Sequence, residues 1–238
     1  MQMTSLRLIA LLLDYPEQEV WDNAQELNHL IKQCAELNEY QKECINQFIE
    51  QMTQTPLMDL QAQYGDLFER GRSLSLLLFE HVHGESRDRG QAMIDLLNQY
   101  NGAGMVLTAK QLPDYLPTYL EYLSQLTVYE SISGLKDVAP ILALLKERLS
   151  QRQSYYSNLL QVLIEQSGEK IAQEKLAETV ANEAKDDTPQ ALDAVWEEEQ
   201  IKFLGDEGCA SVQQTLHQKR FAHAVVPQYL DTKALNGA

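Results

Sequence analysis

Apolar residues recur at steps of three and four along most of this 238-residue chain, and that spacing constrains its fold more than any other feature. The chain has only 11 glycines and 7 prolines, which favours helices over a turn-rich β architecture. The pattern predicts an all-α fold, a single-domain bundle of roughly eight to nine helices over residues 1–226, with a frayed C-terminal tail over 227–238. The apolar stripes cover residues 20–34, 44–52, 57–68, 92–100, 116–123, 141–163 and 192–204.

Two prolines indicate where helices begin. Pro16 is expected in the first turn of the helix that carries the stripe 20–34, where its missing N–H costs nothing. Pro140 is expected at the start of one long helix that carries the stripe 141–163.

Three further segments have a local signal. Residues 101–104, Asn-Gly-Ala-Gly, predict the end of a helix because they tolerate positive φ. Thr188, followed by Pro189, predicts a helix N-cap. Residues 74–79 have no helical period and predict a buried extended or irregular segment.

The chain is strongly acidic. Its 19 Lys and Arg against 35 Asp and Glu give a net charge of −16, which argues against a nucleic-acid binder and favours a partner that is basic where it docks. Residues 165–207 contain 13 of the acidic residues and 4 lysines. This segment has two interpretations: it is either a solvated helix face or an acidic region that attracts a basic segment electrostatically.

Nothing in the sequence predicts export or membrane insertion. The longest apolar runs, 8–13 and 76–79, are far too short for a bilayer span, and no secretory signal is apparent at the N-terminus. The three cysteines form no Cys-x-x-Cys pair, which is typical of reduced thiols. We expect a cytoplasmic protein.

Motifs of catalysis are scarce. There is no glycine-rich phosphate loop and no Gly-x-Ser-x-Gly, so the sequence predicts a protein that is not an enzyme. The one ligand-like pair is His81 and His83, for which hydrogen bonding in a structural turn competes with a metal site.

A basic cluster and an aromatic stripe each have two interpretations. The four arginines are expected to pair with carboxylates of the protein itself or of a partner; they are Arg70, Arg72, Arg87 and Arg89. The aromatic residues lie on helices near Pro113, Pro117 and Glu121, and they form either a core or an apolar groove for another chain. They are Tyr64, Phe68, Tyr115, Tyr119 and Tyr122.

Long strings within these segments resemble a known family. They are YGDLFERGR at 64–72, SLLLFEHVHGESRDRGQAM at 75–93, LPDYLPTYLEYL at 112–123 and DDTPQALDAVWEEEQ at 186–200. The chain is similar, over nearly its whole length, to the nitrate reductase molybdenum cofactor assembly chaperones, which belong to the redox-enzyme maturation chaperones.

The resemblance implies a cytoplasmic, TorD/DmsD-like helical chaperone without a cofactor of its own. Such a protein binds the apo catalytic (alpha) subunit of respiratory nitrate reductase, chiefly its basic, amphipathic N-terminal segment. It holds that subunit competent for molybdenum cofactor and iron–sulfur insertion before membrane anchoring, alongside proteins that deliver the cofactor, and it is absent from the finished enzyme.

The resemblance also suggests peptide-binding residues. Wider relatives have an acidic–Pro–Asp–His motif beside the leader-binding groove; here Asp114 matches and Tyr115 replaces the histidine. The aromatic side chains are expected to supply groove surface, and the two acidic ones to face basic residues of the peptide. The predicted set is Tyr64, Phe68, Asp114, Tyr115, Tyr119 and Glu121.

Three alternatives stay open at this point. The chain could be a leader-peptide proofreading chaperone for another molybdoenzyme, or a stable structural subunit of the mature complex. It could also be a metal-dependent hydrolase centred on His81 and His83. The sequence does not distinguish two paralogous types of the nitrate reductase chaperone.

Overall fold

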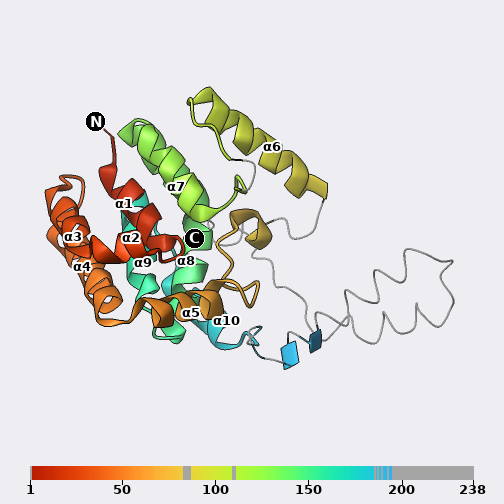
Figure 1. Cartoon of the computed structure of the whole chain (residues 1–238). Coiled ribbons are helices and arrows are strands. Elements are labelled where there is room, and N and C mark those ends of the chain that lie inside the picture. The colour runs from red at the N-terminus through yellow and green to blue at the C-terminus, as the bar shows by residue number, and fades with distance from the viewer. Residues whose placement is uncertain are drawn as a thin grey trace, which may run out of the picture.

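A computed structural model describes residues 2–82, 87–108 and 111–184, together with 186, 188, 190, 191, 193 and 194. These residues contain ten α-helices, one short 3₁₀ helix and no β-strand, so the predicted all-α class is confirmed (Figure 1). The helices are α1 (Thr4–Leu13), α2 (Gln18–Asp22), α3 (Ala24–Gln33), α4 (Glu39–Gln54), α5 (Leu57–Phe68), α6 (Arg87–Gly102), α7 (Leu116–Gln125), α8 (Val128–Gln151), α9 (Tyr156–Ser167) and α10 (Gln173–Ala181), with the 3₁₀ helix η1 (Leu78–His81) between α5 and α6.

The core of the bundle lies between α1, α7, α8 and α9. Helix α1 packs against α7 and α9, and α8 packs along α9 and against α10. Leu6, Ile9 and Leu13 of α1 are fully buried in the apolar core. Burial on almost all sides explains why α1 is a short run of apolar residues rather than an amphipathic stripe.

The predicted first helix is divided in two. The stripe 20–34 runs through α2 and α3, which meet at Asn23 with a non-helical ψ of 18°. The Asn23 side-chain amide donates a hydrogen bond to the Glu19 carbonyl at 2.8 Å, and the Asn23 backbone N–H donates to the same carbonyl at 3.2 Å, so both groups of this residue close the end of α2. This break helps to explain why the helices outnumber the predicted eight to nine.

The prediction for Pro140 is wrong, because this proline lies inside α8. The helix begins at Val128, where Thr127 and Glu130 form a capping box, Glu130 N–H donating to Thr127 Oγ1 and the Glu130 carboxylate accepting from Thr127 N–H. This start satisfies the helix N-terminus twelve residues before the proline. Burial around Pro140 opposes the cost of its missing hydrogen bond.

The long helix predicted over 141–163 is in fact two helices. The helix α8 ends at Gln151 and α9 begins at Tyr156. Between them Gln153 has a φ of +54°, a left-handed conformation that no apolar pattern signals. The turn lets α8 and α9 pack against each other as a helical hairpin (Figure 1).

The segment without helical period is buried and irregular, as predicted. Leu74, Leu76 and Leu78 are buried in the core. The backbone is held to the start of α7 by two hydrogen bonds, from Leu78 N–H to the Asp114 carbonyl at 2.9 Å and from Leu116 N–H to the Leu76 carbonyl at 2.8 Å. This junction brings residues 74–81 directly against the sequence Pro-Asp-Tyr at 113–115.

Two of the predicted helix boundaries are confirmed. The helix α6 ends at Gly102, and Gly104 takes a φ of +81° just beyond it. Ala191 N–H donates to Thr188 Oγ1 at 3.2 Å, the hydrogen bond of an N-cap. The rest of the helix predicted to follow, and the predicted boundary at residue 226, lie outside the described residues. Within the described part of the chain, no helix is long and apolar enough to cross a membrane.

Candidate peptide interface

The Tyr115 side chain joins three elements of the bundle. The Tyr115 hydroxyl donates to Asp14 Oδ1 at 2.9 Å and lies 2.9 Å from the Tyr64 hydroxyl. The Tyr64 hydroxyl lies 3.2 Å from the Leu13 carbonyl. Burial raises the pKa of both phenols, so each remains a neutral hydrogen-bonding group. Tyr115 thus connects the ends of α1, α5 and the start of α7.

The aromatic residues of α5 lie in the interior. Tyr64 and Phe68 are buried, with ring centroids 4.8 Å apart, and both meet the ring of Tyr156 from α9. The spacing is typical of a cluster of edge-to-face rings in a protein core. Of the two interpretations of the aromatic stripe, the core one holds for these two side chains in this structure.

The tyrosines of α7 also pack inward. Tyr119 is buried, and its hydroxyl donates to the Gly134 carbonyl at 3.1 Å. Tyr122 is half-buried, and its ring lies 4.7 Å from that of Tyr100 in α6. Tyr100 donates its hydroxyl to the Pro113 carbonyl at 2.6 Å, which holds the C-terminal end of α6 to the residues before α7.

Asp114 is fully buried rather than on a surface. Its Oδ2 accepts a hydrogen bond from Phe79 N–H at 3.2 Å and lies 3.6 Å from Arg89 Nη2. Burial raises the pKa of this carboxyl, while the Phe79 N–H and the Arg89 guanidinium oppose that rise. In this structure Asp114 faces a basic residue of its own chain.

Of the six predicted binding residues, Glu121 is exposed and Tyr115 is half-buried, while the other four are buried. The structure brings Tyr64, Asp114 and Tyr115 together around the start of α7. Direct contact between the buried members and a peptide stays a prediction, and it requires a conformation in which they are exposed.

The arginine cluster is paired within the protein where its side chains are described. Arg70 and Asp66 form an exposed ion pair of 3.0 Å one helical turn apart. Arg89 lies 3.5 Å from the Glu80 carboxylate in addition to its contact with Asp114. Internal pairing is therefore confirmed for these two arginines; the side chain of Arg87 lies outside the described residues.

His81 forms a hydrogen bond within a structural turn, which was the first of its two interpretations. Its Nε2 donates to the Ser75 carbonyl at 2.7 Å, and burial lowers its pKa below the usual 6.5. His83 lies outside the described residues. Among those that are described, no group of three or more His, Cys, Asp or Glu side chains is arranged to hold a metal. Burial raises the pKa of Cys34 to about 11, which is unlike an activated nucleophile.

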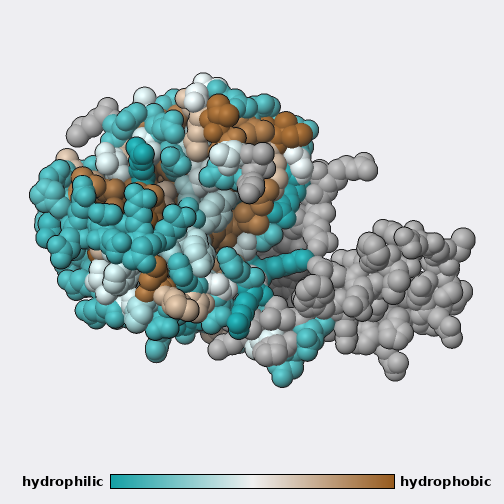
Figure 2. All heavy atoms as spheres, viewed as in Figure 1, coloured by the Kyte–Doolittle hydropathy of each residue, from teal (hydrophilic) through white to brown (hydrophobic). Residues whose placement is uncertain are grey.

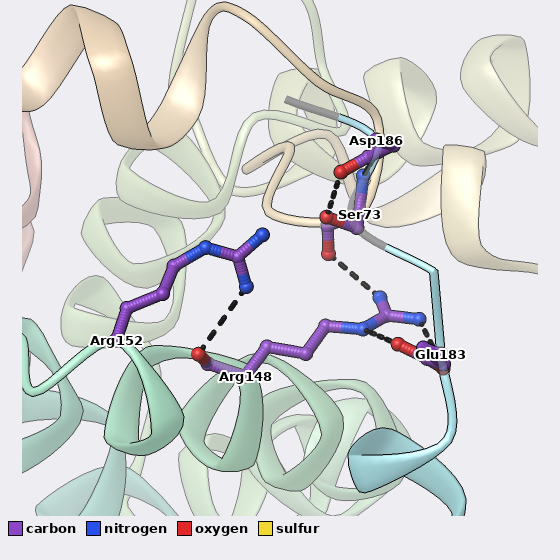
Figure 3. A network of polar contacts seen from close by, with 5 residues as sticks. All are labelled: Ser73, Arg148, Arg152, Glu183 and Asp186. Atoms are coloured by element: carbon purple, nitrogen blue, oxygen red, sulfur yellow. Dashed lines mark hydrogen bonds and ion pairs between the residues drawn. The ribbon is translucent and has the colours of Figure 1, made fainter. Parts of the chain in front are cut away.

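Part of the acidic segment is bound to the protein's own surface (Figure 3). Arg148 donates to both carboxylate oxygens of Glu183, at 2.7 and 2.8 Å, and to the Ser73 carbonyl at 2.6 Å. Ser73 in turn donates its N–H and its hydroxyl to Asp186, both at 2.6 Å. We call Glu183 and Asp186, with their partners Arg148 and Ser73, the acidic strap. These two carboxylates are partly buried, and both are paired within the protein.

An apolar surface that sequence analysis missed lies on α6 and the loop after it. Figure 2 shows a hydrophobic area over this part of the molecule. Ile94 of α6 is 55% exposed, and Val106 and Leu112 of the loop are 82% and 45% exposed. We call these three residues the α6 surface. The sequence did contain a signal, since Ile94 lies off the buried stripe that ends at Tyr100.

Acidic side chains are exposed on α6 and on α7, the helix that follows the loop. Asp95 is exposed on α6, and Glu121 is exposed on α7. Exposed apolar residues with nearby carboxylates are the kind of surface to which a basic, amphipathic helix binds. These exposed residues of α6, α7 and the loop between them form the candidate peptide interface, of the kind found in proteins that bind another chain.

Comparisons with known proteins assign this fold to a family. Residues 23–161 match the family described as nitrate reductase delta subunit, and the chain belongs to that family. It is 52% identical, over 96% of its length and 97% of the relative's, to the nitrate reductase molybdenum cofactor assembly chaperone NarJ of Escherichia coli K12. It is 45% identical, over 99% and 100%, to the probable chaperone NarW of the same strain. A probable NarJ of Bacillus subtilis is 28% identical over 66% of this chain and 84% of that protein.

Proposed function

We propose that this protein is an assembly chaperone of respiratory nitrate reductase. In this proposal it binds the apo catalytic (alpha) subunit in the cytoplasm, chiefly through that subunit's basic N-terminal segment. It keeps the subunit competent for insertion of the molybdenum cofactor and an iron–sulfur centre, alongside the proteins that deliver the cofactor. It acts without catalysis of its own and leaves before the subunit docks on its membrane anchor.

Two kinds of observation support the proposal. The relatives with which it aligns over nearly full length are named molybdenum cofactor assembly chaperones for nitrate reductase. The observation in the structure that carries it is the α6 surface, whose exposed apolar residues lie on α6 and in the loop between α6 and α7, while Asp95 and Glu121 are exposed on those two helices. Apolar contact supplies affinity for an amphipathic helix, while carboxylates and the net charge of −16 speed its capture and orient it.

Release is as important as capture for such a function. A chaperone that leaves its client needs a moderate affinity, and a Kd between micromolar and nanomolar corresponds to about 8–12 kcal/mol. A surface made of three exposed apolar residues with a few carboxylates is consistent with this range, since only a few anchors carry most of an interface's energy.

The proposal is tested by co-purification of the tagged protein with the catalytic subunit, in cells that cannot make the molybdenum cofactor. We expect the full apo-subunit to co-purify, and a subunit that lacks its N-terminal segment to do so far less. Mature, membrane-bound enzyme should be absent from the eluate. A stable structural subunit would instead co-purify with the mature complex, and recovery of a different molybdoenzyme would favour the proofreading alternative.

A further inference from the structure

The irregular segment 73–81 lies between the acidic strap and the candidate interface. It belongs to no α-helix, and only the short 3₁₀ helix η1 gives it regular backbone hydrogen bonds. Because such a segment cannot satisfy its own backbone groups, its position is fixed by the contacts that it makes with other elements. Both ends of this segment are held by hydrogen bonds of that kind.

The acidic strap holds the first end of the segment, at Ser73. The N–H and the hydroxyl of this serine both donate to Asp186 at 2.6 Å, and its carbonyl accepts from Arg148 Nη1 at 2.6 Å (Figure 3). Arg148 is itself buried in α8, and its Nε and Nη2 donate to Glu183. A Cβ on Gly71 would lie 2.8 Å from the Asp186 carboxylate, so the chain before Ser73 also lies close to it. Ser73 is therefore fixed both to α8 and to the chain after α10.

The other end of the segment holds the residues at the start of α7. Leu78 N–H donates to the Asp114 carbonyl at 2.9 Å, and Leu116 N–H donates to the Leu76 carbonyl at 2.8 Å. Phe79 N–H donates to the Asp114 carboxylate at 3.2 Å. These three hydrogen bonds make the position of residues 114–116 depend on that of segment 73–81.

One residue of the α6 surface is attached to the same place. Leu112 is 45% exposed, and its carbonyl accepts from Tyr115 N–H at 3.2 Å. The Tyr100 hydroxyl, near the end of α6, donates to the Pro113 carbonyl at 2.6 Å. The position of Leu112 relative to Ile94 of α6 is thus set at a junction that segment 73–81 supports.

We propose that the acidic strap positions the α6 surface for the client peptide through segment 73–81, and that Ser73 and Asp186 are positioning residues that do not touch the peptide. The inference rests on the proposed function, whose peptide it uses. With the strap in place, the α6 surface is held in one arrangement, so less conformational entropy is lost on binding. With Asp186 detached, segment 73–81 loses its fixed end. The arrangement that binds is then only a fraction of the population, and the apparent affinity falls by that fraction.

The test is calorimetric titration of a synthetic peptide, covering the catalytic subunit's N-terminus, into variants of the full-length protein. Asp186→Ala leaves the ion pair of Arg148 and Glu183 in place, so we expect it to stay folded by circular dichroism and to bind the peptide about five- to tenfold more weakly than wild type. Glu178→Ala is the charge-matched control, since Glu178 is exposed on α10, and it should bind within about twofold of wild type. Equal losses in both variants would reduce the effect to overall charge and overturn the inference.

A second control separates positioning from a general loss of stability. Ser167→Ala removes a buried hydroxyl at the end of α9 that donates to the Ile164 carbonyl at 2.6 Å and accepts from Glu169 N–H at 3.1 Å. We expect this variant to unfold at a lower urea concentration than wild type and to bind the peptide as wild type does. If it weakens peptide binding as much as Asp186→Ala does, the strap acts through stability alone and the inference fails.

Amide hydrogen exchange tests the route through the segment. The N–H groups of Leu78 and Leu116 should exchange about fivefold faster in Asp186→Ala than in Ser167→Ala. By linkage, saturating peptide should slow the exchange of Ser73 N–H in the wild-type protein about five- to tenfold, although Ser73 is not part of the α6 surface. Weaker peptide binding by Asp186→Ala without these changes in exchange would overturn the inference. Absence of peptide binding by wild type would contradict the proposed function itself, whereas binding that ignores Asp186 would contradict this inference alone.

Discussion

Arg148 and Glu183 are 35 residues apart and form a bidentate ion pair, with N–O distances of 2.7 and 2.8 Å. Arg148 is buried in α8, and Glu183 follows α10, so the pair fixes the chain after the last described helix to the centre of the bundle (Figure 3). Asp186 extends the contact to Ser73. Because breaking one partner of such a network leaves a buried charge, the acidic strap is expected to stabilise the fold measurably.

Gly71 offers a sharp test of the acidic strap. A Cβ at this position would lie 2.8 Å from the Asp186 carboxylate, so Gly71→Ala should displace Asp186 from Ser73. We expect a loss of about 1–3 kcal/mol in the free energy of unfolding, measured by urea denaturation. Gly90→Ala is the control, because a Cβ there meets nothing within 4 Å and alanine favours a helix; it should be neutral or stabilising by up to about 1 kcal/mol. Equal effects of the two substitutions would contradict this role of the strap.

His81 predicts a pH dependence of stability. Its pKa in the folded protein is lowered, chiefly by burial, so below pH 6.5 the unfolded chain binds the proton more readily and the folded state loses stability. The groups that face it, Ser75, Glu80, Arg148 and Asp186, shift this pKa in both directions without reversing the sign. The slope contributed by one histidine is at most about 1.4 kcal/mol per pH unit.

His81→Gln should flatten the stability profile between pH 7 and pH 5.5, measured by urea denaturation at each pH. The exposed His29 is the control, and His29→Gln should leave the profile as steep as in wild type. A profile unchanged by His81→Gln would mean that its imidazole is equally easy to protonate in both states.

The α6 surface predicts apolar contacts with the client peptide. Ile94→Ser and Val106→Ser should each weaken peptide binding about tenfold, because burying such a side chain contributes about 1.5 kcal/mol. Met58→Ser removes an apolar residue of α5 that is as exposed as Val106, and it should change the peptide's Kd by less than twofold. Fluorescence anisotropy with a labelled peptide measures all three, and similar losses for Met58→Ser would place the contact elsewhere.

Glu121 predicts an electrostatic contribution to the same interface. Glu121→Lys should slow association and weaken binding of the basic peptide, with the difference from wild type shrinking as salt is added. Glu43→Lys makes the same charge change on the exposed side of α4. Stopped-flow association rates at two salt concentrations compare the two variants, and an equal slowing of both would leave Glu121 with no specific role.

The sequence predicts the helical class well, because apolar periodicity and strong caps are local signals. It also identifies the buried irregular segment 74–79 and the Thr188 cap correctly. It fails at Pro140, because the capping box that starts α8 lies far from the proline. It also fails at Gln153, because the break between α8 and α9 depends on a single residue with positive φ.

The candidate interface is less predictable than the fold. An aromatic stripe looks the same in a sequence whether it forms a groove or a core, and Tyr64 and Phe68 are buried. Arg89 pairs with a residue 9 positions away in the sequence, and Arg148 donates to one 75 positions away. No regular sequence spacing predicts such pairs. Exposure of Ile94 likewise depends on how α6 meets the bundle.

The most direct test of the central claim is calorimetric titration of the wild-type protein with the catalytic subunit's N-terminal peptide at low and high salt. The account predicts saturable binding, one peptide per chain, with an affinity that falls as salt rises. No binding at either salt concentration would contradict the claim that this chaperone-family protein captures that segment of its client.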